Sequence, residues 1–128
     1  DVAPSRGLGD VYKRQILDLK EISQKFVNDL KKMSPFGPDN QKPVFCSLGV
    51  KDYGTSKLVG KELEHLKLEL IDGNSSIPMH AIAFGMHRHN DHIKGMKPFN
   101  ICYTVEENTY NGNTSIQLMI KDIKPDDI

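Results

Sequence analysis

The sequence predicts a mainly β protein: a five-stranded Greek-key barrel of the OB type, with an N-terminal helix and a short helix between strands three and four. One long segment near the N-terminus has the apolar period of a helix, and five later segments have the two-residue period of strands. A short polar segment that fits one or two helical turns separates the third strand from the fourth. An SH3-like barrel is the main competing fold, and it usually lacks such an insert.

The long helix is predicted over 19–33. Four apolar residues recur there at spacings of four, four and three: Ile22, Phe26, Leu30 and Met33. Asp18 or Ser23 supplies a capping side chain at its start. The helix must end before Pro35, because the residue before a proline is pushed out of the α region. The segment 35–43 that follows is a rigid turn rich in proline.

Five segments alternate apolar and polar residues as strands do. They are 44–56, 65–70, 78–84, 99–106 and 116–121. Asn111-Gly112, between the last two segments, is a strong hairpin signal because both residues tolerate a positive φ. The short helical insert is predicted over 86–94. Cys46 and Cys102 fall on the first and fourth strands, which are neighbours in an OB barrel, so they are expected to lie close together as thiols.

Length and charge narrow the class of protein. A length of 128 residues fits one domain. The 17 basic and 17 acidic residues give a net charge of zero, which does not suggest an overall basic nucleic-acid binder. No apolar run reaches the ~18 residues of a membrane span, and no charged segment followed by an apolar run suggests a signal peptide. Two cysteines are too few for a disulfide framework and indicate a reducing, cytoplasmic location.

The chain is expected to be one domain with flanking segments. Residues 1–15 show no sustained period, and the string from Pro4 to Gln15 resembles a translated sequencing adapter, so this segment is expected to be a spurious or disordered tail. The remaining segments are a connector helix with its Pro/Gly turn at 16–42, the barrel domain at 43–125 and a tail at 126–128. Residues 1–15 hold three basic and two acidic residues, so the rest has a net charge of −1.

The sequence contains neither a Gly-x-Ser-x-Gly elbow nor a phosphate-binding Walker loop. Glu106 and Glu107 are adjacent, and adjacent strand residues point to opposite faces, so they are poor partners for acid–base chemistry. His87, His89 and His92 form a histidine cluster in which the last two lie three residues apart on a predicted helix, a possible metal pair. No cysteine or carboxylate of suitable spacing completes a set of metal ligands. A small metalloprotein built on this cluster is kept as an alternative.

A surface for single-stranded nucleic acid is the better supported hypothesis. OB folds bind single strands across the second and third strands, flanked by the loops after the first and fourth. On this surface lysines would attract phosphates, and tyrosine or histidine rings would stack on bases. The candidates are Lys51, Tyr53, Lys57, Lys61, His65, Lys67, Tyr110 and Asn111. The alternative is an ordinary barrel surface, since lysine and tyrosine are also normal surface residues.

The segment PFGPDNQKPVF, at 35–45, resembles the signature Pro-Phe-Gly-x-Gly-Asn-x-x-Pro-x-Phe of bacterial RecJ. RecJ is a single-strand-specific 5′-to-3′ exonuclease of the DHH phosphoesterase superfamily that acts in DNA repair and recombination. Further similarities follow in order at 60–70, 82–85, 110–118 and 121–123. The resemblance covers about 16–128, and Asp39 departs from the family's usual glycine or glutamate.

The resemblance implies the OB fold that follows the catalytic DHH and DHHA1 domains of the same chain and grips single-stranded DNA. It implies manganese or magnesium for those missing domains, so this chain is expected to be a fragment without catalytic residues or a cofactor of its own. The segment 91–93 is not the Asp-His-His motif. The candidate nucleic-acid surface and the RecJ-like motif overlap at three residues: Lys61, His65 and Lys67. The alternative is a protein-interaction OB module without direct DNA contact.

Overall fold

The computed structural model describes residues 14–33, 35–37, 41–73, 75 and 77–125. Most of the predicted N-terminal tail and all of the predicted tail at 126–128 lie outside these residues. In the described ranges, no helix has the length and apolar character needed to cross a membrane.

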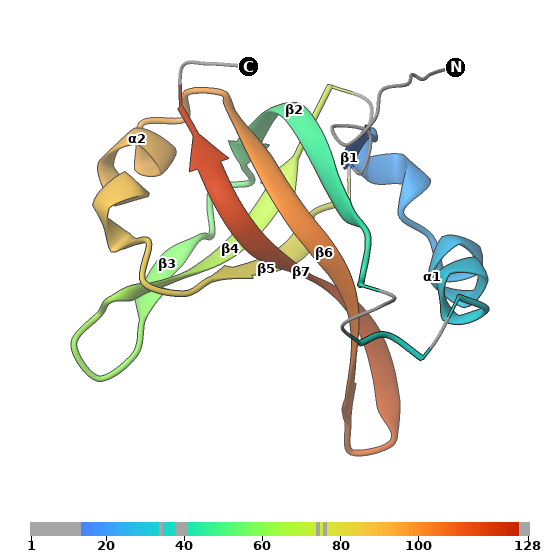
Figure 1. Cartoon of the computed structure of the whole chain (residues 1–128). Helices are drawn as coiled ribbons and strands as arrows, with labels where there is room; N and C mark the ends of the chain where they lie inside the picture. Colours follow the sequence, from blue (N-terminus) through green and yellow to red (C-terminus); the bar gives the residue numbers. More distant parts are fainter. Residues whose placement is uncertain (1–13, 34, 38–40, 74, 76, 126–128) are drawn as a thin grey trace.

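Five strands close into a ring (Figure 1). They are β2 (Val44–Asp52), β4 (His65–Ile71), β5 (Met79–Ala83), β6 (Phe99–Tyr110) and β7 (Asn113–Lys124). Their order is β2–β6–β7–β5–β4, and a β2–β4 pairing returns to the start. The β5–β7 pair is parallel and the others are antiparallel. The mainly β class and the predicted five-stranded barrel are therefore confirmed, and each predicted strand segment holds one strand of the ring.

The barrel core comes from the inward residues of these strands. Leu66, Leu68 and Leu70 alternate along β4 and are fully buried. The register sets Leu66 opposite Ala83 and Leu68 opposite Ala81, so two of the three buried leucines of β4 face a small side chain of β5. Such alternation of large and small residues lets the layers interdigitate without voids. It also fixes which residues of β4 and β5 point outward.

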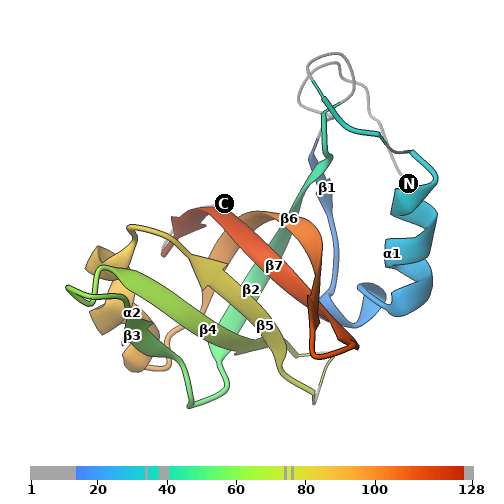
Figure 2. The same cartoon turned by 90° about the horizontal axis from the view of Figure 1, so that it is seen from below.

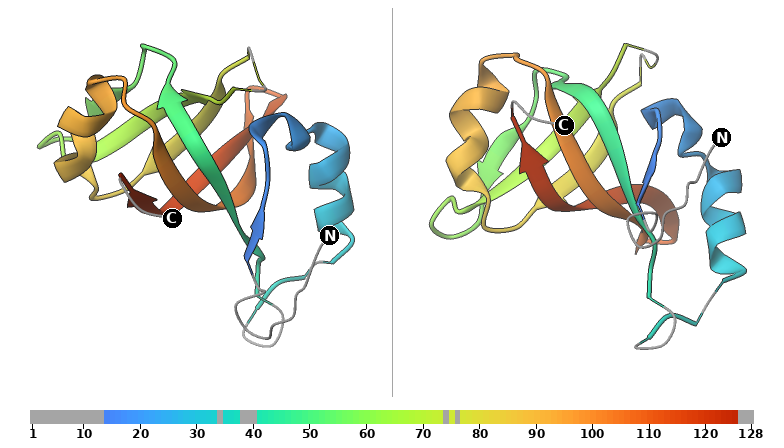
Figure 3. Two further views of the ribbon diagram at one scale, coloured as in Figure 1. Left: turned by 90° about the horizontal axis from the view of Figure 1, so that it is seen from above. Right: turned by 45° about the horizontal axis from the view of Figure 1, so that its top comes forward.

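Two short strands at the edges are absent from the prediction. β1 (Arg14–Ile16) pairs in parallel with β2, and β3 (Lys57–Val59) pairs antiparallel with β4. Each has three residues, too few to show a period. Arg14 and Gln15, which the sequence analysis assigns to the tail, thus belong to the sheet. Figure 3 shows β1 lying alongside β2 at the side of the barrel that carries the N-terminal helix.

The predicted helix at 19–33 is two helices, η3 (Leu19–Glu21) and α1 (Gln24–Lys31). The division falls at Ser23, whose backbone is extended and whose Oγ accepts a hydrogen bond from the Phe26 N–H at 3.2 Å. A serine in this position satisfies a helix-terminal N–H and starts a new helix instead of continuing the old one. Phe26 packs edge-on against Phe45 of the barrel, with ring centroids 5.3 Å apart.

Changing Ser23→Ala is expected to lower the free energy of unfolding by about 1 kcal/mol, because the Phe26 N–H loses its acceptor. Chemical denaturation followed by circular dichroism measures this. Ser23→Asp keeps an acceptor and should retain most of the stability. Equal stability of Ser23→Ala and the unchanged protein would contradict the capping role.

The helical insert between the third and fourth strands of the ring is also present. It consists of η4 (His87–His89) and α2 (Asn90–Lys94), as the segment 86–94 predicts. Ile93 is fully buried, so the insert packs one apolar side chain into the core. Figure 1 shows α2 covering one end of the barrel, on the side away from α1.

Candidate nucleic-acid interface

The outward residues of β3, β4 and β5 form one polar surface, named here the β3–β5 face. Because Leu66, Leu68 and Leu70 point inward, the residues between them point outward. The strand register and ring contacts arrange the outward side chains in three rows: Val59 with His65 and Phe84, Lys57 with Lys67 and Ile82, and Glu69 with His80. Figure 2 shows β3, β4, β5 and β7 side by side in this order.

The central row carries two positive charges in direct apposition. Lys57 of β3 lies opposite Lys67 of β4, and both side chains are exposed. Among the described residues, neither lysine takes part in an ion pair. Like charges directly opposite each other in a sheet are destabilising. A bound anion would remove that repulsion, so this row is suited to hold a phosphate.

The row beside it presents an exposed aromatic ring. Phe84 follows β5 and is 56% exposed, and its ring meets the His65 ring edge-on with centroids 5.0 Å apart. His65 Nδ1 accepts a hydrogen bond from the Gly85 N–H at 2.8 Å, which holds the imidazole in place. An exposed aromatic ring held by a fixed neighbour can stack on a base. Phe84 therefore joins the candidate site.

Phe84 is not among the binding residues predicted above, although the sequence contains a signal for it. Ala81 and Ala83 share the inward face of the third predicted strand. Because alternate residues of a strand point to opposite faces, Phe84 is expected to point outward, as Ile82 does. A phenylalanine that points outward at the end of a strand is a candidate for contact with a ligand.

Acidic groups limit the positive charge at both ends of the face. Glu69 lies 3.1 Å from the His80 ring and accepts a hydrogen bond from Thr55 Oγ1. Hydrogen bonds from the backbone N–H groups of Glu64 itself and of Glu62 outweigh partial burial and hold the pKa of Glu64 below its ordinary value. Since Glu64 stays ionised beside His65, the positive potential is concentrated at Lys57 and Lys67.

The other predicted residues lie around the face and not on it. Lys61 is exposed in the turn between β3 and β4. Lys51 and Tyr53 are exposed at the end of β2 and just beyond it, near the far end of β4. Tyr110 and Asn111 lie at the tip of the β6–β7 hairpin, with Tyr110 78% exposed. The views in Figures 1 and 2 place that hairpin and the β3–β4 turn at opposite ends of the molecule, with β4 and β5 between.

The histidine cluster gives no support to a metal centre. His87 Nδ1 lies 3.2 Å from the Glu64 carbonyl oxygen, and His92 Nε2 lies 3.0 Å from the Pro98 carbonyl oxygen. Burial is the largest cause that lowers the pKa of His89. Within the part of the chain that the structure describes, no group of three or more histidine, cysteine, aspartate and glutamate side chains is arranged to hold a metal ion.

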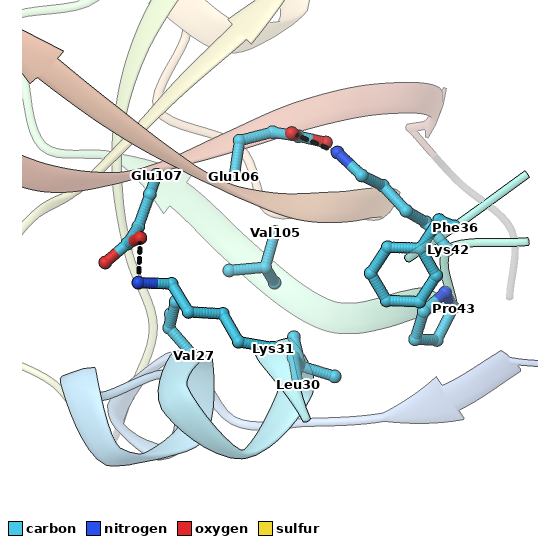
Figure 4. Close-up of a pocket in the computed structure, with 9 residues that line it drawn as sticks. All are labelled: Val27, Leu30, Lys31, Phe36, Lys42, Pro43, Val105, Glu106 and Glu107. Atoms are coloured by element: carbon cyan, nitrogen blue, oxygen red, sulfur yellow. Dashed lines mark hydrogen bonds and ion pairs between the residues drawn. The ribbon is translucent and has the colours of Figure 1, made fainter. Parts of the chain in front are cut away.

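A small cleft of about 190 Å³ lies between α1, the proline-rich turn and β6 (Figure 4). Its apolar lining consists of Val27, Leu30, Phe36, Pro43 and Val105. At its rim, Lys31 pairs with Glu107 and Lys42 pairs with Glu106. Hydrogen bonds from Lys31 and Gln24 lower the pKa of Glu107. The two ion pairs tie α1 and the proline-rich turn to β6 of the barrel. Because each lysine at the rim is paired with a glutamate, the cleft offers no net positive charge to a phosphate.

Comparison with known proteins identifies the domain type. The family described as the RecJ OB domain matches residues 15–122. The crystal structure of RecJ from Thermus thermophilus with Mn²⁺ aligns with 89% of this chain at a TM-score of 0.65 and 16% sequence identity. The same RecJ with Mg²⁺ aligns over 89% at a TM-score of 0.62 and 14% identity. No curated protein shows significant similarity to the sequence.

The likeness to these two structures is at the level of the fold. It confirms the OB type of the barrel. The chain spans about 16% of the length of the RecJ chains that it matches.

Proposed function

The chain belongs to the RecJ OB domain family, and from this premise we propose that it binds single-stranded DNA across the β3–β5 face. The observation that carries the proposal is the apposition of Lys57 and Lys67, two exposed cations on neighbouring strands. A phosphate between them offsets their repulsion, and releasing condensed counterions from the DNA adds a favourable entropy. The surface around them supplies the second element of single-strand binding, an exposed ring at Phe84.

Binding of this kind is tolerant of sequence. Backbone phosphates carry no sequence information, and every base has a face that an aromatic ring can stack on. The β3–β5 face would therefore hold a strand of any sequence, with a phosphate between Lys57 and Lys67 and a base at Phe84. Such tolerance suits a domain that holds DNA while another domain processes it.

The proposal extends to the role of the domain in a longer enzyme. We propose that it works beside DHH and DHHA1 domains in a cytoplasmic 5′-to-3′ single-strand exonuclease of DNA repair and recombination. Manganese or magnesium would act in those domains; the similar Thermus RecJ was crystallised with each of these ions. The part of this domain would be to hold the strand and help present its 5′ end.

Fluorescence anisotropy with a labelled oligo-dT tests the proposal. The unchanged protein should bind with an affinity that falls as salt increases. The double variant Lys57→Ala/Lys67→Ala should bind about 10-fold more weakly, and the slope of log K against log salt should become shallower by about 0.7, the contribution of the one single-strand phosphate held between the two lysines.

The double variant Lys25→Ala/Lys32→Ala is the matched control, because it removes the same charge from two exposed lysines away from the face, one in α1 and one at its C-terminal cap. Its affinity should stay within about 2-fold of the unchanged protein. If both double variants lost affinity equally, the loss would come from the lower net charge of the domain and not from the two lysines of the β3–β5 face. Binding without salt dependence, or no binding at low salt, would contradict the proposal and favour a protein-interaction module.

A further inference from the structure

Two cysteines lie directly opposite each other on neighbouring strands of the barrel. The register pairs Cys46 of β2 with Cys102 of β6. Their Sγ atoms are 2.8 Å apart, and both residues are thiols. A disulfide bond is about 2.05 Å long, so the two sulfur atoms need to approach by less than 1 Å to be joined.

The backbone geometry at this pair is also the one that brings side chains closest. The Cys46 carbonyl accepts a hydrogen bond from the Leu17 N–H, on the β1 side of β2. In an extended strand the N–H and C=O of one residue point to the same side, so those of Cys46 point away from β6. Cys46 and Cys102 are thus a non-hydrogen-bonded pair, for which the Cα atoms are about 4.5 Å apart. That separation lies within the range of disulfides.

Exposure differs between the two thiols. Phe45 and Ser47 are buried in the barrel, so Cys46 lies on its outer side and is partly exposed. Cys102 is 7% exposed. An oxidant from solution therefore reaches Cys46 first, and Cys102 is positioned to react with the product.

We propose that Cys46 and Cys102 are a redox-active pair that a peroxide converts to an intramolecular disulfide. The Cys46 thiolate attacks one peroxide oxygen, the O–O bond breaks, and a sulfenic acid and one water form after proton uptake. Cys102 releases its proton to solvent, and its thiolate attacks the Cys46 sulfur. The S–O bond breaks, and the hydroxide that leaves takes up a proton to form a second water. In sum, two thiols and one hydrogen peroxide give one disulfide and two water molecules.

The disulfide would join β2 to β6 across one seam of the barrel. The two cysteines are 56 residues apart in the sequence. A cross-link over this distance lowers the conformational entropy of the unfolded chain and so stabilises the folded domain. Neither strand contributes to the β3–β5 face, so this inference stands apart from the proposed DNA binding. The oxidised domain should therefore melt at a higher temperature than the reduced one.

Treatment of the reduced protein with a small excess of hydrogen peroxide tests the proposal. Intact mass spectrometry should show a loss of about 2 Da, the mass of two hydrogen atoms. Titration of thiols in denaturant should fall from two per chain to none, and a non-reducing digest should contain the Cys46–Cys102 peptide pair. The melting temperature should rise by about 10 °C and return after reduction.

The single variants Cys46→Ser and Cys102→Ser are the controls, and circular dichroism checks their folding. Neither should lose 2 Da or gain thermal stability on oxidation. Retention of both thiols in the unchanged protein would overturn the proposal. So would the addition of oxygen to each cysteine without a linked peptide, or a disulfide formed only between two chains.

Discussion

Replacing Asp52 with alanine is expected to lower the free energy of unfolding by about 3 kcal/mol. Asp52 is 1% exposed, and its Oδ1 accepts hydrogen bonds from the N–H groups of Gly54 and Ser56 at 3.0 and 3.1 Å. Lys94 Nζ lies 3.9 Å from Oδ2. Removing the carboxylate leaves two N–H groups without their acceptor and takes away the opposite charge beside Lys94, whose Nζ still donates to the Ser56 carbonyl oxygen. Urea denaturation followed by circular dichroism measures the loss.

The same carboxylate makes the domain less stable in acid. Burial acts to raise the pKa of Asp52, but hydrogen bonds from Ser56 and Gly54 and the charge of Lys94 outweigh it, and the pKa lies below the ordinary 3.8. A depressed pKa means that the folded state favours the ionised group. The stabilisation is present above pH 3.8 and is lost as the pH falls through the lower pKa of the folded state.

Asp52→Asn separates the two effects, because the amide keeps an acceptor but does not titrate. This variant should be more stable than Asp52→Ala and should lose less stability between neutral and acid pH than the unchanged protein. Equal pH dependence in Asp52→Asn and the unchanged protein would contradict the assignment. Equal stability of Asp52→Ala and the unchanged protein would contradict the role of the hydrogen bonds.

Changing Phe84→Ala is expected to weaken binding of oligo-dT by about 5- to 150-fold, the equivalent of the 1–3 kcal/mol of one base stacked on an aromatic ring. Phe84 is 56% exposed, so the stability of the domain should change by no more than about 0.5 kcal/mol. Fluorescence anisotropy at fixed salt measures the affinity. The salt slope should stay the same, because the ring contacts no phosphate.

Two further variants define the role of the ring. Phe84→Tyr keeps an aromatic face and should retain most of the affinity. Ile77→Ala removes an apolar side chain of the β4–β5 connection that is 79% exposed, and its affinity should not change. Wild-type affinity in Phe84→Ala, or an equal loss in Ile77→Ala, would count against stacking at this position.

The barrel could be predicted because its signals are local. The alternation of Leu66, Leu68 and Leu70 with polar residues indicates a half-buried strand without knowledge of any partner. The division of the N-terminal helix at Ser23 was less accessible, because the apolar period continues through it from Ile22 to Phe26. There the capping preference of one side chain outweighs the periodic pattern.

The candidate site was harder to predict because it depends on register. Lys57 and Lys67 are named from the sequence, but only the pairing of β3 with β4 shows that they face each other. β3 exists because the turn at Asp52 ends β2 earlier than predicted and redirects the chain. Tyr110, by contrast, directly precedes the Asn111-Gly112 turn signal, so its position at the hairpin tip could be predicted from the sequence, and its pairing with Asn113 agrees.

The ring of strands is joined unequally around its circumference. The β6–β7 pairing includes eleven residue pairs, whereas β2 meets β4 through two, Lys51 with Ile71 and Asp52 with Leu70, and β5 also meets β7 through two. Local opening of the native state is easiest where the fewest interactions must break. β2 and β4 approach each other over a smaller part of their length than β5 and β7 do, so we expect local opening at the β2–β4 seam. Because β3, β4 and β5 remain paired when this seam parts, such opening would leave the β3–β5 face intact.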